Sequence, residues 1–220
     1  MPKLRVHNFT ISLDGYAAGP NQRLDAPFGD GVEGMHDWMF ATRAVRAAQG
    51  LDGGVEGLDN DRILLAENGV GATIMGRNMF GPVRGEWPDH SWTGWWGPNP
   101  PYHNDVFVMT RYPRPTFSLE GGNTFHFVDQ GPEAALKLAF NAADGKDVLL
   151  AGGATTIRQF LRAGLIDDLY LVIAPIFIGG GERLFDDLDG GLDRYQCIEQ
   201  VSTSTATHLH ITRRNPDPAL

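Results

Sequence analysis

In the stretch Val148-Leu149-Leu150-Ala151-Gly152-Gly153-Ala154-Thr155-Thr156-Ile157-Arg158-Gln159-Phe160-Leu161, an apolar run stops at two glycines and an amphipathic helical pattern follows. Glycine lets a backbone approach a ligand closely. Free N–H groups and the positive dipole end at the start of a helix favour a bound phosphate. A buried strand that turns sharply into a helix uses Gly-Gly as well, so a purely structural role stays open at this junction.

Two further apolar runs end in small, hydroxyl or cationic residues. Gly71–Met75 leads into Gly76 and Arg77, and Val106–Thr110 leads into Arg111. Arginine offers a planar fork of donors that suits phosphate oxygens. The alternative for each arginine is a solvated surface charge. Three strand ends of this kind favour a ligand site, because ligands of open α/β sheets bind at the carboxyl ends of the strands.

Strand and helix patterns alternate along most of the chain. We expect strands at residues 4–13, 71–75, 106–110, 124–128, 148–150, 169–177 and 205–212. We expect helices at residues 35–48, near 61–67, from Pro132, and from the Gly152-Gly153 turn to Gly164. This alternation predicts a three-layer α/β fold, and the last two strands form an antiparallel edge pair because no helix separates them. We expect one domain over residues 1–214 and a flexible tail over 215–220.

Composition limits the class of protein. The 220-residue chain has 18 lysines and arginines against 27 aspartates and glutamates, for a formal net charge of −9. This charge argues against nucleic acid and acidic membrane surfaces as partners. The single cysteine, Cys197, excludes an internal disulfide and suits a reducing compartment. We see neither a signal peptide nor a membrane-spanning pattern, and we expect a cytoplasmic protein.

Four motifs, in this order, resemble the dihydrofolate reductase-like superfamily. They are ISLDGY at 11–16, IMGRNMF at 74–80, LAGGA at 150–154 and LIDDLYL at 165–171. The chain is most similar to the branch of the C-terminal reductase domain of the riboflavin-biosynthesis deaminase-reductase, and the resemblance covers nearly the whole chain. It implies a dihydrofolate reductase-like fold with a central, mostly parallel eight-stranded sheet, an antiparallel edge pair, helices on both faces, and NADPH as hydride donor.

The resemblance also assigns roles to residues by their position. It implies that Gly76, Arg77 and Asn78 bind the cofactor, with Arg77 near the 2′-phosphate. It implies that Thr110 and Arg111 line the adenosine side. It implies that the pyrophosphate is held by Gly152, Gly153, Ala154, Thr155 and Thr156. Asp14 begins the loop that covers nicotinamide in this superfamily, so we expect it on the cofactor side, although an aspartate before a glycine is often a turn residue. We expect no metal site.

The chain departs from these relatives in ways that affect the substrate. Riboflavin-pathway reductases usually carry a glutamate just before the Gly-Gly turn, where this chain has Ala151. Their phosphoribosyl-binding segment after the second strand is replaced by residues 76–80. Dihydrofolate reductases place an acidic residue at the start of the helix after the first strand, and Asp37 is the candidate catalytic residue there. A first-turn aspartate also favours a helix dipole, which is the structural alternative.

Two loops are unusual. Residues 84–103 contain four of the five tryptophans. This segment is either a stacking wall for a flat heterocycle or a stiff flap that packs on the body or across a dimer seam. Residues 178–185 contain three consecutive glycines but lack the Lys-Ser/Thr of a nucleotide-hydrolase loop, so we expect a turn between edge strands.

We therefore expect an NADPH-dependent reductase of a small planar heterocycle in the pteridine or pyrimidine range. It would resemble either dihydrofolate reductase or 5-amino-6-(5-phosphoribosylamino)uracil reductase, and we expect a homodimer. The nicotinamide supplies the redox chemistry in such enzymes, while the protein binds, orients and excludes water. The alternative is a nucleotide-binding protein of the same fold without significant turnover.

Overall fold

The computed structural model describes residues 1–66, 68–81, 84–188 and 191–214. Its strands are β1 (Leu4–Ser12), β2 (Tyr16–Ala18), β3 (Val70–Gly76), β4 (Asp105–Met109), β5 (Phe117–Leu119), β6 (Asn123–Val128), β7 (Asp147–Gly152), β8 (Asp168–Ala174), β9 (Glu182–Arg183), β10 (Tyr195–Ser202) and β11 (Thr207–Arg213). Its helices are α1 (Asp37–Phe40), α2 (Arg43–Ala48), α3 (Leu58–Ala66), α4 (Arg77–Phe80), α5 (Pro132–Ala142) and α6 (Ala154–Ala163), with 3-10 turns η1 (Glu120–Gly122) and η2 (Gly191–Arg194). The predicted tail, 215–220, lies outside the described residues.

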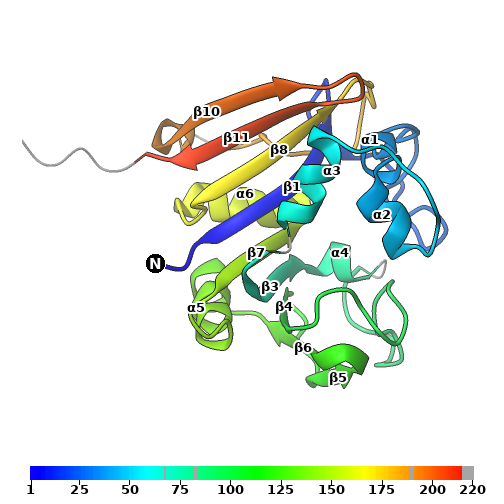
Figure 1. The fold of residues 1–220 in the computed structure, drawn as a ribbon. Helices are drawn as coiled ribbons and strands as arrows, with labels where there is room; N and C mark the ends of the chain where they lie inside the picture. The colour runs from blue at the N-terminus through cyan, green and yellow to red at the C-terminus, as the bar shows by residue number, and fades with distance from the viewer. Residues whose placement is uncertain (67, 82–83, 189–190, 215–220) are drawn as a thin grey trace, which may run out of the picture.

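Within these ranges, nine strands form one sheet in the order β10-β11-β8-β1-β7-β3-β4-β6-β5 (Figure 1). The six neighbouring strands from β8 to β6 are parallel. β11 runs antiparallel to β8, β10 to β11, and β5 to β6. The predicted mostly parallel sheet with an antiparallel edge is confirmed. The count is nine rather than eight, and the sequence expectations omit β5 and β10.

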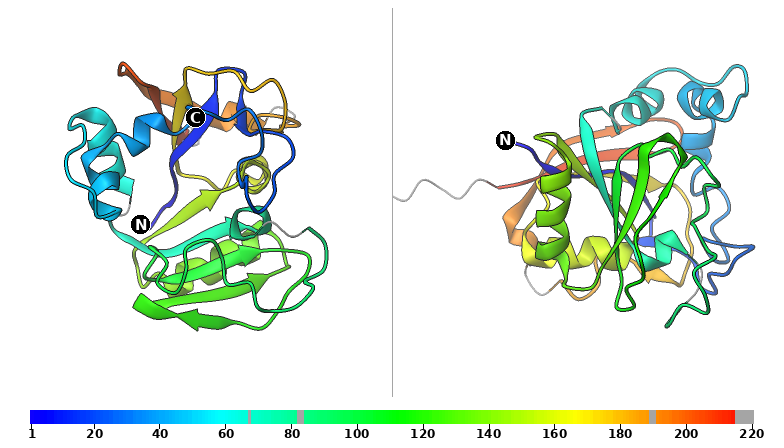
Figure 2. Two further views of the ribbon diagram at one scale, coloured as in Figure 1. Left: turned by 90° about the vertical axis from the view of Figure 1, so that its right-hand side faces the viewer. Right: turned by 90° about the horizontal axis from the view of Figure 1, so that it is seen from below.

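Helices cover both faces of the sheet, as predicted, and they leave a gap on one of them (Figure 2). α5 and α6 pack over the middle of one face and bury the main core, which includes Leu4, Ile74, Leu150 and Ile157. On the other face, α1 and α3 pack near β8 and β1, and α4 packs near β3 and β4. The region between these two groups borders the middle of β1, where residues 7–9 are half-buried.

An aromatic cluster, defined by Met75, Phe80, Val106, Val108 and Phe125, lies on the α4 side of the sheet. The rings of Trp87, Trp92 and Trp96 pack against it from the tryptophan-rich segment. This segment therefore takes the place of a long helix over β3, β4 and β6.

Two predicted element boundaries are wrong. The expected helix 35–48 is two helices, because Thr42 adopts an extended backbone and caps α2 by accepting a hydrogen bond from Val45 N. The expected strand 169–177 ends at Ala174, where Pro175 follows and cannot donate to the sheet. No described helix has the length and apolar character needed to cross a membrane.

Candidate active site

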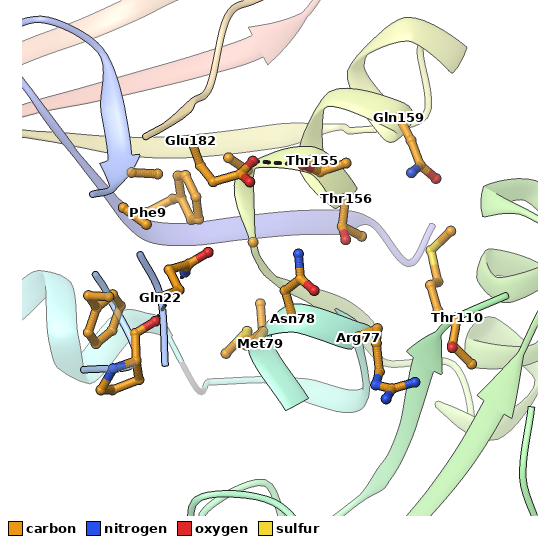
Figure 3. Close-up of a pocket in the computed structure, with 18 of the residues that line it drawn as sticks. Phe9, Gln22, Arg77, Asn78, Met79, Thr110, Thr155, Thr156, Gln159 and Glu182 are labelled. Atoms are coloured by element: carbon orange, nitrogen blue, oxygen red, sulfur yellow. Dashed lines mark hydrogen bonds between the residues drawn. The ribbon is translucent and has the colours of Figure 1, made fainter. Parts of the chain in front are cut away.

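A cavity of about 830 Å³ opens at the carboxyl ends of β1, β7, β3, β4 and β6 (Figure 3). This volume lies in the ordinary range for a small-molecule or cofactor site. The strand ends and helix starts contribute His7, Asn8, Phe9, Thr10, Arg77, Asn78, Met79, Met109, Thr110, Arg111, Tyr112, Val128, Asp129, Ala151, Gly153, Ala154, Thr155, Thr156 and Gln159. Loops and β9 add Gln22, Phe28, His36, Met39, Arg84, Trp95, Trp96 and Glu182, among others.

The junction between β7 and α6 forms one wall. A Cβ built at Gly153 meets no atom within 4 Å, so this glycine leaves open space on the cavity side. The Gly153 carbonyl accepts hydrogen bonds from the N–H groups of Thr156 and Ile157 and so closes the first helical turn. The N–H groups that precede those two have no intrahelical acceptor in any α-helix and are available to an anion.

Gly152 stands behind this wall rather than in it. Its φ of +129° favours glycine, and a Cβ there would come within 3.0 Å of Phe9 Cε2. Gly152 therefore allows the tight turn between β7 and α6 and is not among the cavity-lining residues.

The junction between β3 and α4 faces the first one. Gly76 is buried, and a Cβ at this position would overlap the Thr156 hydroxyl. Gly76 thus lets the starts of α4 and α6 pack against each other. Gly76 is not among the cavity-lining residues, so the structure gives it a packing role, and its predicted contact with a cofactor stays a prediction.

Arg77 begins α4 and carries a buried cation into the cavity wall. Its guanidinium lies 3.0 Å from the centroid of the Trp87 ring, and among the described residues none of its three nitrogens has a hydrogen-bond partner. Burial first, and then the neighbouring cations Arg114 and Arg84, lower the pKa of Arg77 to about 10. The side chain remains a cation at neutral pH. A buried cation without a counter-charge is costly, so this wall favours an anionic ligand.

Arg114 holds the tryptophan-rich segment near Arg77. Its guanidinium lies within 5.4 Å of the ring centroids of Phe80, Trp87, Phe117 and Phe127, and one nitrogen donates to the Trp92 carbonyl oxygen. Arg114 is not predicted from the sequence, because nothing about an arginine between two prolines signals burial.

The tryptophan-rich segment packs on the body, which is one of its two expected roles, while stacking on a heterocycle stays a prediction. The indole N–H groups of Trp87, Trp92 and Trp95 donate to the carbonyl oxygens of Tyr112, Phe80 and Met79, which ties the segment to the body. Trp95 and Trp96 also line the cavity. The segment is therefore a packed flap that presents part of its inner face to the cavity.

Eight of the predicted cofactor residues line this one cavity: Arg77, Asn78, Thr110, Arg111, Gly153, Ala154, Thr155 and Thr156. Thr110 and Arg111 follow the end of β4, where the Thr110 N–H donates to the Val128 carbonyl. Arg111 is exposed at the cavity rim. The expectation that three strand ends converge is met by the geometry, while their binding roles stay predictions.

Asp14 and Asp37 lie outside the cavity lining. The Asp14 carboxylate accepts hydrogen bonds from Ser12 Oγ at 2.6 Å, Gly179 N at 2.7 Å and Ile178 N at 3.1 Å. These bonds, the one from Ser12 above all, lower the pKa of Asp14 to about 2. Its carboxylate thus joins the turn after β1 to the loop at residues 178–179, and its predicted place on the cofactor side stays a prediction. Asp37 is exposed in the first turn of α1.

The floor of the cavity contains residues that the sequence analysis did not single out. Asn8 has a φ of +53°, and the register of β1 against β8 shifts between Val6 and Phe9. Such a bulge redirects side chains, and residues 7–10 all line the cavity. Burial, with a contribution from Arg5, lowers the pKa of His7 to about 3, so His7 is neutral at physiological pH. Burial also lowers the pKa of His36, which replaces Asp37 as the lining residue from this helix start.

The glycine-rich stretch 178–185 leads into β9, which pairs with β2 in a small separate sheet. The turn prediction holds in outline, but β9 is not an edge strand of the main sheet. Glu182 is the residue of this stretch that lines the cavity.

A comparison with known protein families identifies the family of the chain. The RibD C-terminal domain matches residues 2–209. The chain belongs to this family. Among sequence relatives, the uncharacterized protein YyaP of Bacillus subtilis is 46% identical over 61 residues, which are 28% of this chain and 30% of YyaP. The chain thus matches less than a third of that relative's length.

Two solved structures share the fold of this RibD C-terminal domain. A Shewanella protein described by its name as one of riboflavin biosynthesis superposes with a TM-score of 0.59 at 21% identity, over 98% of this chain and 100% of that one. A deaminase and 5-amino-6-(5-phosphoribosylamino)uracil reductase of Thermotoga maritima superposes with a TM-score of 0.55 at 12% identity, over 97% of this chain and 57% of that longer one.

Proposed function

We propose that this RibD-family domain is an NADPH-dependent reductase of a small planar heterocycle. The buried Arg77 guanidinium is the observation that carries the proposal, because it lines the cavity as a cation without a counter-charge among the described residues. A 2′-phosphate would supply that counter-charge. Membership of the RibD C-terminal domain family supports a reductase, and the Thermotoga relative carries such an activity in its name.

The cavity has room for the rest of the dinucleotide in a consistent order. Arg77 and Thr110 lie at one end, the start of α6 lies in the middle, and Phe9 and Gln22 lie at the other end (Figure 3). Arg111, next to Thr110 in the chain, also lines the cavity. We assign the adenosine side to the first group and the pyrophosphate to the N–H groups of α6. The nicotinamide would then lie beside Phe9, Ala17 and Ala18, and it would supply the hydride.

The protein's own residues at that end are suited to holding an uncharged ring. Phe28, Met39, Met79 and Trp95 provide apolar and aromatic walls, and the neutral His7 and His36 provide polar edges. Such walls exclude water and orient flat ligands. Among the described lining residues the carboxylates are Asp129 and Glu182, and neither comes from the β1 floor or the α1 side. We therefore propose a substrate that carries no positive charge. That it also lacks a phosphoribosyl group rests on the replacement of the phosphoribosyl-binding segment by residues 76–80.

The test measures NADPH consumption across a panel of pteridines, pyrimidines and other C=N or C=O heterocycles. Steady oxidation with at least one member supports a reductase. Tight NADPH binding with no turnover across the panel favours the alternative, a nucleotide-binding protein. The absence of NADPH binding would exclude both.

A second measurement addresses the riboflavin-pathway substrate. Because Ala151 stands where a pyrimidine-binding glutamate would lie, we expect weak turnover of the phosphoribosylated intermediate. A substrate whose polar groups lose their partner can be disfavoured by about 10⁴-fold. Complementation of a strain that lacks the reductase, with a purified kcat/KM of about 10⁴ M⁻¹s⁻¹ or more, would overturn this expectation.

A further inference from the structure

Glu182 brings a carboxylate into the cavity beside the start of α6. It belongs to β9, and it pairs with Ala18 of β2, which also lines the cavity. The Leu184 N–H donates to the Gly15 carbonyl, and the Arg183 guanidinium donates to the Asp14 carbonyl. These bonds fix the backbone on which Glu182 stands.

The Glu182 side chain makes one hydrogen bond that joins it to the α6 wall. Its Oε2 accepts from the Thr155 hydroxyl at 3.0 Å, and an Arg158 nitrogen lies 3.9 Å from the same oxygen. The side chain is 36% exposed, so the carboxylate keeps acceptor capacity toward the cavity. Figure 3 shows Glu182 joined to Thr155 and placed toward Phe9, on the opposite side of the α6 start from Arg77 and Thr110.

A carboxylate at this place selects among the parts of a dinucleotide. It repels the pyrophosphate, because both are anions, and it can only accept hydrogen bonds. A ribose diol offers two hydroxyl donors, and carboxylates bind such hydroxyls in other dinucleotide sites. A dinucleotide with its 2′-phosphate at Arg77 and its pyrophosphate at α6 would present its second ribose next, in the direction of Phe9.

We infer that Glu182 is a cofactor-binding residue whose carboxylate accepts hydrogen bonds from the hydroxyls of the ribose on the nicotinamide side. This inference rests on the proposed NADPH site. It adds a residue that determines where the ribose lies, and therefore how the nicotinamide is placed over the β1 floor.

The experiment compares three probes: NADPH; 2′-phospho-ADP-ribose, which lacks the nicotinamide; and adenosine 2′,5′-bisphosphate, which also lacks the second ribose and the phosphate that carries it. The first two contain the second ribose, and the third does not. Dissociation constants are measured by calorimetry for the wild-type protein and for Glu182→Ala, Glu182→Gln and Arg77→Ala. Glu133→Ala, an exposed first-turn residue of α5, is the matched control, and melting curves verify that each variant folds.

A charge-assisted hydrogen bond is strong enough that Glu182→Ala should weaken NADPH and 2′-phospho-ADP-ribose by about tenfold or more. The affinity for adenosine 2′,5′-bisphosphate should be the same in Glu182→Ala as in the wild-type protein. Glu182→Gln should show a smaller loss in the same direction, and Arg77→Ala should weaken all three probes.

Three results would overturn the inference. They are unchanged NADPH affinity in Glu182→Ala, an equal loss for the probe without the second ribose, and a gain of affinity in Glu182→Gln, which would mean that the carboxylate only repels the pyrophosphate. If the folded wild-type protein binds none of the probes, the proposed NADPH site itself is wrong. Wild-type binding that Glu182→Ala leaves intact removes this inference alone.

Discussion

The β7–α6 and β3–α4 junctions are built from the same sequence elements and use their glycines in opposite ways. Each is a buried strand that ends in glycine and turns into a helix. At Gly153 the missing side chain leaves open space in the cavity, whereas at Gly76 it leaves room for Thr156 of the other junction. Gly153 therefore leaves room at the cavity, where we propose that the ligand binds, while Gly76 serves packing, and the contact between the two junctions brings both helix starts to one cavity.

The largest effect on cofactor affinity is expected from a substitution at the β7–α6 junction. Gly153→Val should reduce NADPH affinity by more than about a hundredfold, because the new side chain occupies the space in which we place the pyrophosphate. The fold should persist, since no protein atom lies within 4 Å of a Cβ there. The measurement is a binding titration with a melting curve.

Gly180→Val is the matched control for that variant. A Cβ at Gly180 also meets no atom within 4 Å, and this residue is outside the cavity lining. It should bind NADPH as the wild type does. Normal binding by Gly153→Val would show that the phosphate lies elsewhere.

A smaller effect is expected from the cation that follows the second junction. Arg77→Ala should weaken NADPH by about tenfold to a hundredfold, because a hydrogen bond to a charged group contributes roughly 1.5–3 kcal/mol. NADH affinity should barely change, since it lacks the 2′-phosphate. Arg111→Ala, at the exposed rim, should lose less. Equal losses for both cofactors in Arg77→Ala would contradict the assignment.

Gly76→Ala tests the packing role of Gly76 through the free energy of unfolding rather than through cofactor affinity. Its methyl group would overlap the Thr156 hydroxyl and lie 3.3 Å from Thr156 Cβ. Overpacking of this kind costs about 1–3 kcal/mol of unfolding free energy. Urea denaturation measures the loss. Removing the hydroxyl in a Gly76→Ala/Thr156→Ala double variant should restore part of it, and a purely additive double variant would argue against the clash.

The smallest expected effect is a pH dependence at Arg77. The dianion of a phosphate monoester takes up one proton near a pKa of about 6. The preference for NADP⁺ over NAD⁺ should therefore fall a few-fold between pH 7.5 and 5, where the 2′-phosphate loses one negative charge. Arg77→Ala should show little of this change. A pH-independent preference in the wild type would place the 2′-phosphate away from a cation.

The junctions could be predicted from sequence because their signal is local. An apolar run, a glycine and a hydroxyl or cationic residue follow one another in each, and parallel strands bring their carboxyl ends to one edge. The alternation of strands and helices predicts the three layers for the same reason. The different roles of Gly76 and Gly153 could not be predicted from sequence, since they depend on which atoms of other elements lie next to each glycine in the folded structure.

Other parts depend on long-range contacts that leave no local pattern. β10 was missed because only Tyr195 of its eight residues is buried, so it shows no alternation. Glu182 was missed because β9 is two residues long, and its place in the cavity depends on pairing with β2. Asp37 is predicted from sequence position alone, and in the structure the neighbouring His36 lines the cavity instead, because the orientation of a short helix is not encoded in a local pattern.

The packing of the tryptophan-rich segment gives the molecule an optical property. Trp95 and Trp96 line the cavity, while Trp38 lies in the separate cluster with Val172 and Ala206. A reduced nicotinamide absorbs light at the wavelengths that indoles emit. Binding of the proposed NADPH in the cavity should therefore quench the tryptophan fluorescence of the protein by energy transfer. The tryptophans nearest the nicotinamide ring should be quenched most. Replacing Trp95 by phenylalanine would separate its share of that signal from the signal of the tryptophans fixed to the aromatic cluster.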